Sequence, residues 1–259
     1  MFPIQRRNSR WWHLLNASSR ELILRGATRP FADNIIVNEY PKSGGSWFSQ
    51  MLSAAVDIPY PRNRLPSLTT CLMQCHVHNP LGMRNVVVVW RDGRDIVVSY
   101  YHHLMIGHEF ADSQLAKENA KKIGINDRAD IQENLPKFID ALMEKKIGPR
   151  FSWPQFVDTW SNRQGIVETR YEDLLVKPEQ ELSRVVRELT PGNPEDALIS
   201  EIVEKYSFKS QSGRSTGTEE QGKFLRKGVA GDWVNYFSDD AIESFNHHAG
   251  DALKKLGYE

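Results

Sequence analysis

Short apolar runs that lead into polar, glycine-bearing loops mark the first half of this chain. The mostly apolar run at 35–39 enters a Pro-Lys-Ser-Gly-Gly-Ser loop at 41–46, and an amphipathic stretch from 47 to about 56 follows. This order predicts a strand, a glycine loop and a helix. The segment at 71–79, Cys-Leu-Met-Gln-Cys-His-Val-His-Asn, predicts a short strand that ends near two histidines.

Valines at 86–89 follow one another without polar alternation, which is typical of a strand buried on both faces of a parallel sheet. A charged turn comes next, and Asp95 is expected to cap the helix that follows it. The run at 165–171 predicts a further strand. Apolar spacing predicts helices at 153–160, 180–189, 195–206 and in the last 25 residues, ending near Gly257. The pattern indicates an α/β fold with a central parallel sheet flanked by helices.

Length and composition narrow the class of protein. The chain has 259 residues, with 40% hydrophobic and 25% charged residues, and these values fit one globular domain over 1–259, with 1–33 as an N-terminal extension. The 33 basic and 33 acidic residues cancel, so no net charge favours nucleic acid. The two cysteines suggest no disulfide framework, and no apolar run has the length of a membrane span. We expect a cytoplasmic protein.

The 41–46 loop has the composition of an anion site. Two glycines allow successive N–H groups to point inward, and the following helix adds the positive end of its dipole. Lys42 adds a charge, and Ser43 and Ser46 add hydroxyl donors. The Walker pattern requires lysine after the second glycine, whereas Lys42 precedes both, so an ordinary ATP or GTP loop of that type is excluded. A plain strand-to-helix turn remains the alternative for this loop taken alone.

A second anion site is predicted after the valine strand. Arg91 stands at its C-terminal end, where open α/β sheets bind ligands, and Ser99 lies one helical turn beyond Asp95. The alternative is that Arg91 only pairs with a neighbouring aspartate. The segment 209–231 is rich in glycine, serine and basic residues, and we expect it to close over a ligand with several negative charges; a disordered surface loop is the alternative. The histidines at 102 and 103 are expected on a solvated helix face.

Four stretches, in order, resemble the cytosolic-type sulfotransferases that use 3′-phosphoadenosine 5′-phosphosulfate (PAPS). The loop at 41–47 is similar to the family's P-K-S-G-T-T-W, and 91–101 resembles its 3′-phosphate motif. Residues 170–174 resemble its Y-E-D segment, and 224–237 resembles its R-K-G-x-x-G-D-W-x-N-x-F motif. The resemblance implies a sulfotransferase fold of the P-loop-kinase-like type, with PAPS as co-substrate, 3′,5′-adenosine bisphosphate (PAP) as product and no metal.

The resemblance also implies roles for individual residues. Lys42 would bind the phosphosulfate and stabilise the charge on the leaving oxygen, with the 5′-phosphate held by Ser43, Gly44, Gly45 and Ser46. Trp47, Tyr171 and Phe208 would form the base pocket, with Ser207 beside it. The 3′-phosphate would be held by Arg91, Ser99, Arg226, Lys227 and Gly228, and Ser99 is also placed among the catalytic residues.

A histidine in a K-T-H segment is the base of the family, and Gln74-Cys75-His76 is its counterpart here. His76 is therefore the predicted base and His78 the alternative. A zinc site from the two cysteines and these histidines is disfavoured by their spacing. The chain departs from the family in Gly45-Ser46 for the threonine pair, in Gln74 for the lysine, and in lacking the K-T-V-E dimer segment.

Two other functions remain open at this point. A P-loop-like nucleotide kinase predicts a Walker loop and a carboxylate for Mg²⁺, and a catalytically inactive nucleotide-binding protein needs neither Lys42 nor the histidines. The sequence names no acceptor for the sulfuryl group. The resemblance suggests a hydroxyl or amine of a small metabolite, a sugar or a lipid, and it leaves the oligomeric state open.

Overall fold

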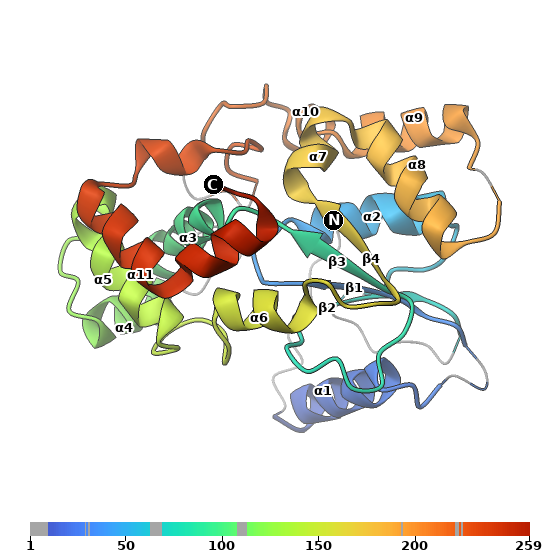
Figure 1. Cartoon of the computed structure of the whole chain (residues 1–259), viewed down its shortest axis with the longest axis horizontal. Coiled ribbons are helices and arrows are strands. Elements are labelled where there is room, and N and C mark those ends of the chain that lie inside the picture. The colour runs from blue at the N-terminus through green and yellow to red at the C-terminus, as the bar shows by residue number, and fades with distance from the viewer. Residues whose placement is uncertain are drawn as a thin grey trace.

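A four-stranded parallel sheet forms the centre of the protein in this computed structural model, which describes residues 10–28, 30, 32–62, 69–107, 113–192, 194–220, 223 and 225–259 (Figure 1). The strands are β1 (Ile35–Glu39), β2 (Leu72–Cys75), β3 (Val86–Trp90) and β4 (Ile166–Arg170), in the order β2-β1-β3-β4. All three neighbouring pairs are parallel. The predicted α/β class with a central parallel sheet is confirmed.

Helices cover both faces of this sheet (Figure 1). One face packs against α2 (Gly45–Ala55), α8 (Pro178–Leu189) and α9 (Asp196–Tyr206). The other packs against α3 (Gly93–Tyr101), α5 (Ile131–Met143), α6 (Trp153–Trp160) and α11 (Asp239–Leu256). The remaining elements are α1 (Arg10–Leu24), η1 (His102–Ile106), α4 (Ser113–Lys122), α7 (Tyr171–Val176), α10 (Phe208–Ser212) and η2 (Asp232–Asn235).

The valine run divides its side chains between the two cores, as a strand of period two must. Val87 and Val89 lie in the cluster with α2 and α8, whereas Val86 and Val88 lie in the cluster with α3 and α6. All five residues of β3 are buried, which confirms the prediction of a strand covered on both faces. No helix in the described part of the chain is long and apolar enough to cross a bilayer.

The start of α3 differs from its prediction. Asp92, and not Asp95, is the N-cap, because its carboxylate accepts the backbone N–H of Arg94 at 2.9 Å. Asp95 lies in the first turn and is buried, and its two oxygens accept the backbone N–H groups of Gly231 at 2.7 Å and Trp233 at 3.0 Å. Asp95 therefore anchors the C-terminal end of the basic segment to α3.

The apolar periodicity of the sequence did not predict two short helices. The predicted helix at 180–189 is α8, which begins at Pro178, but α7 precedes it directly from Tyr171. The segment 209–231 was expected to be a loop throughout, and it begins within α10. Six and five residues are too few to show a helical repeat. Phe224 of the fourth motif and residues 63–68 of the proline-rich loop lie outside the described residues.

The strand order indicates where a ligand of this fold is expected to bind. From β1 the chain crosses to β2 on one side, and β3 and β4 lie on the other side, so the connections diverge between β1 and β3. Ligands of open α/β sheets bind outside the carboxyl ends of the strands at such a point. The glycine loop at 41–46 comes shortly after β1, and Arg91 follows β3 directly. The loop and Arg91 therefore meet at this point.

Candidate active site

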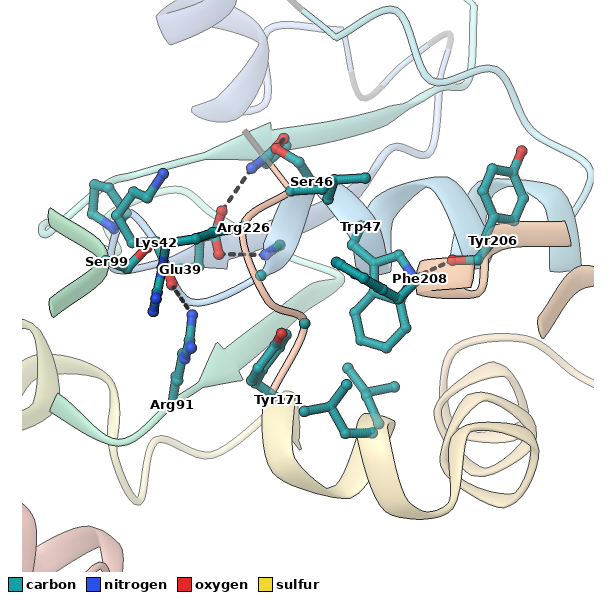
Figure 2. Close-up of a pocket in the computed structure, with 18 of the residues that line it drawn as sticks. Glu39, Lys42, Ser46, Trp47, Arg91, Ser99, Tyr171, Tyr206, Phe208 and Arg226 are labelled. Carbon is teal, nitrogen blue, oxygen red and sulfur yellow. Dashed lines mark hydrogen bonds between the residues drawn. The ribbon is translucent and has the colours of Figure 1, made fainter. Parts of the chain in front are cut away.

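A cavity of about 1290 Å³ opens at the carboxyl ends of the strands. It is bordered by the 41–47 loop, by the residues after β2 and β3, by α7 and by the segments at 206–216 and 225–230. Figure 2 shows cationic and polar side chains toward one end, Lys42, Arg91, Ser99 and Arg226, and the aromatic side chains of Trp47, Tyr171 and Phe208 toward the other. Fourteen of the fifteen predicted site residues line this cavity, and Ser43 is the exception.

The glycine loop begins with a lysine in an uncommon backbone conformation. Lys42 has φ of 79°, in the left-handed region that costs a non-glycine residue about 1–2 kcal/mol. Gly44 follows with φ of 93° and stands directly before α2. These two left-handed residues turn the chain from β1 into α2. The turn brings Lys42, Gly44, Gly45 and Ser46 to the cavity wall.

Lys42 is a desolvated cation. Its burial, with the neighbouring guanidinium of Arg91, lowers the pKa of its ammonium group to about 8. The carboxylate of Glu39 opposes this shift by favouring the charged form. An ammonium group in such surroundings interacts more strongly with an anion than one in water does.

Ser43 is placed differently from its prediction. It is fully buried and does not line the cavity. Its hydroxyl donates to the carbonyl oxygen of Tyr40 at 2.7 Å, and its backbone N–H donates to the same oxygen at 3.2 Å. Both donors of Ser43 are thus used to close the loop. Its side chain supports the shape of the site.

Arg91 and Ser99 both line the cavity, as the second anion motif predicted. The guanidinium of Arg91 donates to the carbonyl oxygen of Lys42 at 3.0 Å and lies 4.3 Å from the ring centroid of Tyr171. Its distance to the carboxylate of Asp95 is 3.9 Å, too long for a strong ion pair. Its Nε is buried without a hydrogen-bond partner in the part of the chain that the structure describes. Pairing with Asp95 alone does not account for this arginine.

Arg226 and Lys227 reach the same cavity and carry counter-ions of their own. Arg226 lies 2.7 Å from Asp232 and 3.0 Å from Glu219, and Lys227 lies 2.9 Å from Asp232 and 3.2 Å from Glu219. The Asp232 and Glu219 carboxylates hold the two cations in place. Behind them, burial and the charge of Arg226 lower the pKa of His102 to about 4, so this histidine is neutral at pH 7.

The aromatic end is built against two glycines. The ring of Tyr171 lies against Gly44, where an added Cβ would come 3.0 Å from Cε2. The ring of Phe208 lies against Gly228 in the same way, because a Cβ added at Gly228 would lie 2.8 Å from Cγ of that ring. Gly228 has φ of 66°. The indole of Trp47 donates to the carbonyl oxygen of Tyr206 at 2.8 Å (Figure 2). Ser207 lines the cavity beside Phe208. The three rings therefore give this end of the cavity the aromatic surfaces on which a planar base stacks.

The two candidate histidines have different surroundings. His76 lines the cavity, and its Nδ1 lies 3.2 Å from the carbonyl oxygen of Glu39. Because a carbonyl oxygen only accepts, Nδ1 carries the proton and Nε2 is left as the basic nitrogen. His78 does not line the cavity. Its Nε2 lies 2.7 Å from the hydroxyl of Thr159, and its ring stacks on Phe151.

No metal cluster accompanies these residues. Across the described ranges, no three His, Cys, Asp or Glu side chains are grouped closely enough to hold a metal ion. Cys71 and Cys75 are buried free thiols, and the thiol of Cys75 lies 3.3 Å from the side-chain oxygen of Asn38. The zinc site that the sequence disfavoured gains no support.

The sulfotransferase domain family matches residues 32–257, which is most of the chain and all four motifs. The chain belongs to the sulfotransferase domain family. Sulfotransferase 1A1 of Canis lupus familiaris is 23% identical over 273 residues, which cover 86% of this sulfotransferase and 83% of the relative. Flavonol 4′-sulfotransferase of Flaveria chlorifolia is 22% identical, with 95% and 87% covered.

Solved structures confirm the predicted sulfotransferase fold. Mouse sulfotransferase SULT7A1, complexed with PAP, superimposes with a TM-score of 0.61 at 17% identity and covers 93% of this chain and 96% of that one. Retinol dehydratase in complex with androsterone and inactive cofactor PAP gives 0.59 at 16% identity, with 94% and 86% covered. The family and the fold agree with the order of the four motifs.

The residues that line the cavity of this sulfotransferase without having been predicted as site residues include Glu39, Gln74 and His103. His103 was expected to be solvated, but it is half-buried in the cavity wall. Glu39 is a buried carboxylate at the end of β1. A charged residue at the end of an otherwise apolar strand was the only signal for it, and such a residue more often faces solvent.

Proposed function

We propose that this sulfotransferase moves the sulfuryl group of PAPS to a hydroxyl or amine of a small acceptor, with His76 as the base. The observation that carries the proposal is the convergence on one cavity of the glycine loop, Arg91, the 226–228 segment and His76. These segments are far apart in sequence. PAPS is proposed as co-substrate and PAP as product, in keeping with the PAP complexes of the similar structures.

The residues present fit a nucleotide with a 3′-phosphate. The buried Nε–H of Arg91 can donate a hydrogen bond to a ligand. The same cavity is lined by Ser99, Arg226, Lys227 and Gly228. A desolvated guanidinium without an anion is costly, which favours a ligand that supplies one. The aromatic end of the cavity, lined by Trp47, Tyr171 and Phe208, suits the base.

Lys42 has the position to stabilise charge on the leaving oxygen. Sulfuryl transfer, like phosphoryl transfer, asks the protein mainly to hold the reactants in line and to stabilise charge. The ammonium group is desolvated at the cavity wall, so its interaction with the developing charge is weakly screened by water. Ser46 and the N–H groups of Gly44 and Gly45 are proposed to hold the 5′-phosphate.

His76 is proposed to take the proton of the acceptor. Its Nδ1 is committed to the carbonyl oxygen of Glu39, and Nε2 is the nitrogen that accepts. Gln74, Ser99 and His103 line the same cavity and add polar groups to its wall. The acceptor is a small molecule, and the class of metabolite, sugar or lipid remains a proposal, as does a cytoplasmic location.

The test compares the two histidines. PAP release from PAPS is followed with a panel of phenols, alcohols, sugars and amines. His76→Ala is expected to lower the rate by about 10²–10⁴-fold, the contribution of a positioned base. His78→Ala is the matched control, because His78 is held by Thr159 outside the cavity, and it should keep most of the rate. Equal losses in both variants would contradict His76 as the base.

A further inference from the structure

One buried carboxyl group in the cavity wall has no part in the proposed chemistry. Glu39 ends β1 directly before the glycine loop, and it is only 3% exposed. Burial raises the pKa of its carboxyl group, and the neighbouring His76 and the N–H of Gly45 oppose that shift. Figure 2 shows this side chain between the loop, Lys42 and Ser46. Its surroundings indicate what it does there.

The carboxylate is held by two donors. The backbone N–H of Gly45, the first residue of α2, donates to Oε2. The side-chain amide of Gln74 donates to Oε1 at 2.6 Å. The amide is itself fixed in this orientation, because its oxygen accepts the hydroxyl groups of Ser46, at 3.0 Å, and of Tyr60. Glu39 therefore has one well-defined position under the loop.

Gly45 is shaped to admit this carboxylate. A Cβ at Gly45 would lie 2.5 Å from Oε1 and 2.7 Å from Oε2 of Glu39, closer than any real contact. The family loop P-K-S-G-T-T-W has a threonine at this place. The carboxylate of Glu39 thus fills the space that a side chain at position 45 would take. The glycine at position 45 and the buried glutamate at position 39 therefore belong to one arrangement.

This carboxylate lies where the loop would bind an anion. An N–H at the first residue of a helix is a donor to anionic ligands, and the loop is proposed to use it for the 5′-phosphate. A carboxylate that already accepts this N–H is an anion supplied by the protein itself. A phosphate brought to the same loop meets a like charge at close range, and it must share or displace the bond to Gly45.

We propose that Glu39 is an internal anion of the glycine loop, which competes with the 5′-phosphate group of the nucleotide and so weakens its binding. The inference rests on the proposed function, because it takes PAPS and PAP as the ligands. Glu39 is a positioning residue: it keeps the loop folded before the nucleotide arrives, and it lowers the affinity for the product that must leave afterwards.

The titratable groups around this carboxylate determine the pH at which ligand affinities should be measured. They are Lys42 in the loop, His76 and Cys75 at the end of β2, Tyr60 in the loop after α2, and Tyr100 in α3. Glu39 also favours the charged form of Lys42, whose pKa is about 8. Because burial raises the pKa of Glu39 as well, the affinities are measured from pH 6.5 to 7.5, where Lys42 is mainly protonated and the ionised fraction of Glu39 increases with pH.

The experiment measures the affinity of two ligands for Glu39→Gln by calorimetry. PAP carries the 5′-phosphate, whereas adenosine 3′-monophosphate lacks it and serves as the control ligand. We expect Glu39→Gln to bind PAP about tenfold more tightly, the factor of one pKa unit of like-charge coupling. Adenosine 3′-monophosphate should change by less than twofold, so the ratio of its Kd to that of PAP should rise about tenfold.

Two further variants keep the result interpretable. Glu39→Ala removes the carboxylate without placing a second amide against Gln74, and it should raise the same ratio if Glu39→Gln fails to fold. Glu172→Gln is the matched control, because Glu172 is also desolvated in the cavity wall but bonds to Asp92 and Tyr258 instead of the loop. It should leave the ratio unchanged.

The outcomes separate the two proposals. An unchanged or lowered ratio in Glu39→Gln and Glu39→Ala would show that the carboxylate only supports the loop, and would overturn the inference alone. A natural protein that binds neither ligand would overturn the proposed function, and the inference with it. A raised ratio in both variants, absent from Glu172→Gln, supports the internal anion.

Discussion

At the scale of single residues, the cavity depends on a lysine that is both strained and desolvated. Lys42 occupies the left-handed region, and its ammonium group is buried beside Arg91. Its pKa of about 8 means that the group is charged below this pH and loses its charge above it in the free protein. An anionic ligand favours the charged form, so the affinity for the ligand depends on pH.

The pH dependence is the prediction at this scale. The affinity for PAP should fall as the pH rises from 7 to 9.5, by up to about tenfold per unit above 8, because binding must then return a proton to Lys42. Lys42→Ala should remove this fall and lower kcat by about 10²–10³-fold, the cost of losing one group that stabilises developing charge. Calorimetry across the pH range gives the first result and PAP release the second.

Lys254→Ala, an exposed lysine in α11, is the control, and it should keep both the pH dependence and the rate. A flat affinity profile in the natural protein would contradict the view of Lys42 as a desolvated cation at the ligand.

Residue identity was predictable where a motif carried it and not where packing did. Arg91, Ser99 and Trp47 line the cavity as the motifs indicated. Ser43 does not, because its hydroxyl turns inward to Tyr40, and a hydroxyl in a loop has no sequence mark that tells ligand from backbone as its partner. Glu39 was missed because its side-chain partner, Gln74, comes from a different strand.

At the scale of elements, the contact between α3 and the C-terminal basic segment decides how the anion site closes. Asp95 accepts the N–H groups of Gly231 and Trp233 from the first turn of α3, only four residues after Arg91. Arg226 and Lys227 lie shortly before those N–H groups, and Asp232 holds both cations. One buried carboxylate therefore links the two halves of the proposed 3′-phosphate site.

Asp95→Asn tests this link. The amide keeps one acceptor but turns a donor toward the other N–H, so one buried N–H loses its partner at a cost of about 1–3 kcal/mol. We expect the melting temperature to fall by several degrees and the affinity for PAP to fall with it. Asp251→Asn, an exposed position of α11, is the control for the charge. Unchanged affinity with a lowered melting temperature would show that the link serves stability only.

Elements were predictable in proportion to their length and regularity. The valine strand and the helix ending at Leu256 before Gly257 appear as predicted, because a buried strand and an amphipathic helix of 18 residues show their periods clearly. Periodicity gave no sign of α7 and α10, whose five or six residues cover little more than a turn. The cap of α3 moved from Asp95 to Asp92, because two aspartates near one helix start satisfy the same sequence rule.

At the scale of the whole molecule, the sheet order gathers residues that are distant in sequence. The loop after β1, Arg91 after β3 and the segment at 225–230 meet at the carboxyl ends of the strands, and the helices on the two faces hold them there (Figure 1). Parallel strands predicted such a meeting edge. The strand order β2-β1-β3-β4 and the depth of the cavity could not be predicted from the hydrophobic pattern, because they depend on which helix covers which face of the sheet.

The most direct measurement is the binding of PAP against ADP and ATP, by calorimetry at matched ionic strength and pH 7. The account predicts that PAP binds at least about 10²-fold more tightly than ADP, because a site built to bind the 3′-phosphate is left with unpaired buried donors without it. Arg91→Ala should remove most of that preference while the fold is kept. If ATP binds as tightly as PAP or more tightly, the account is contradicted, and the cavity is better explained as the site of a nucleotide kinase.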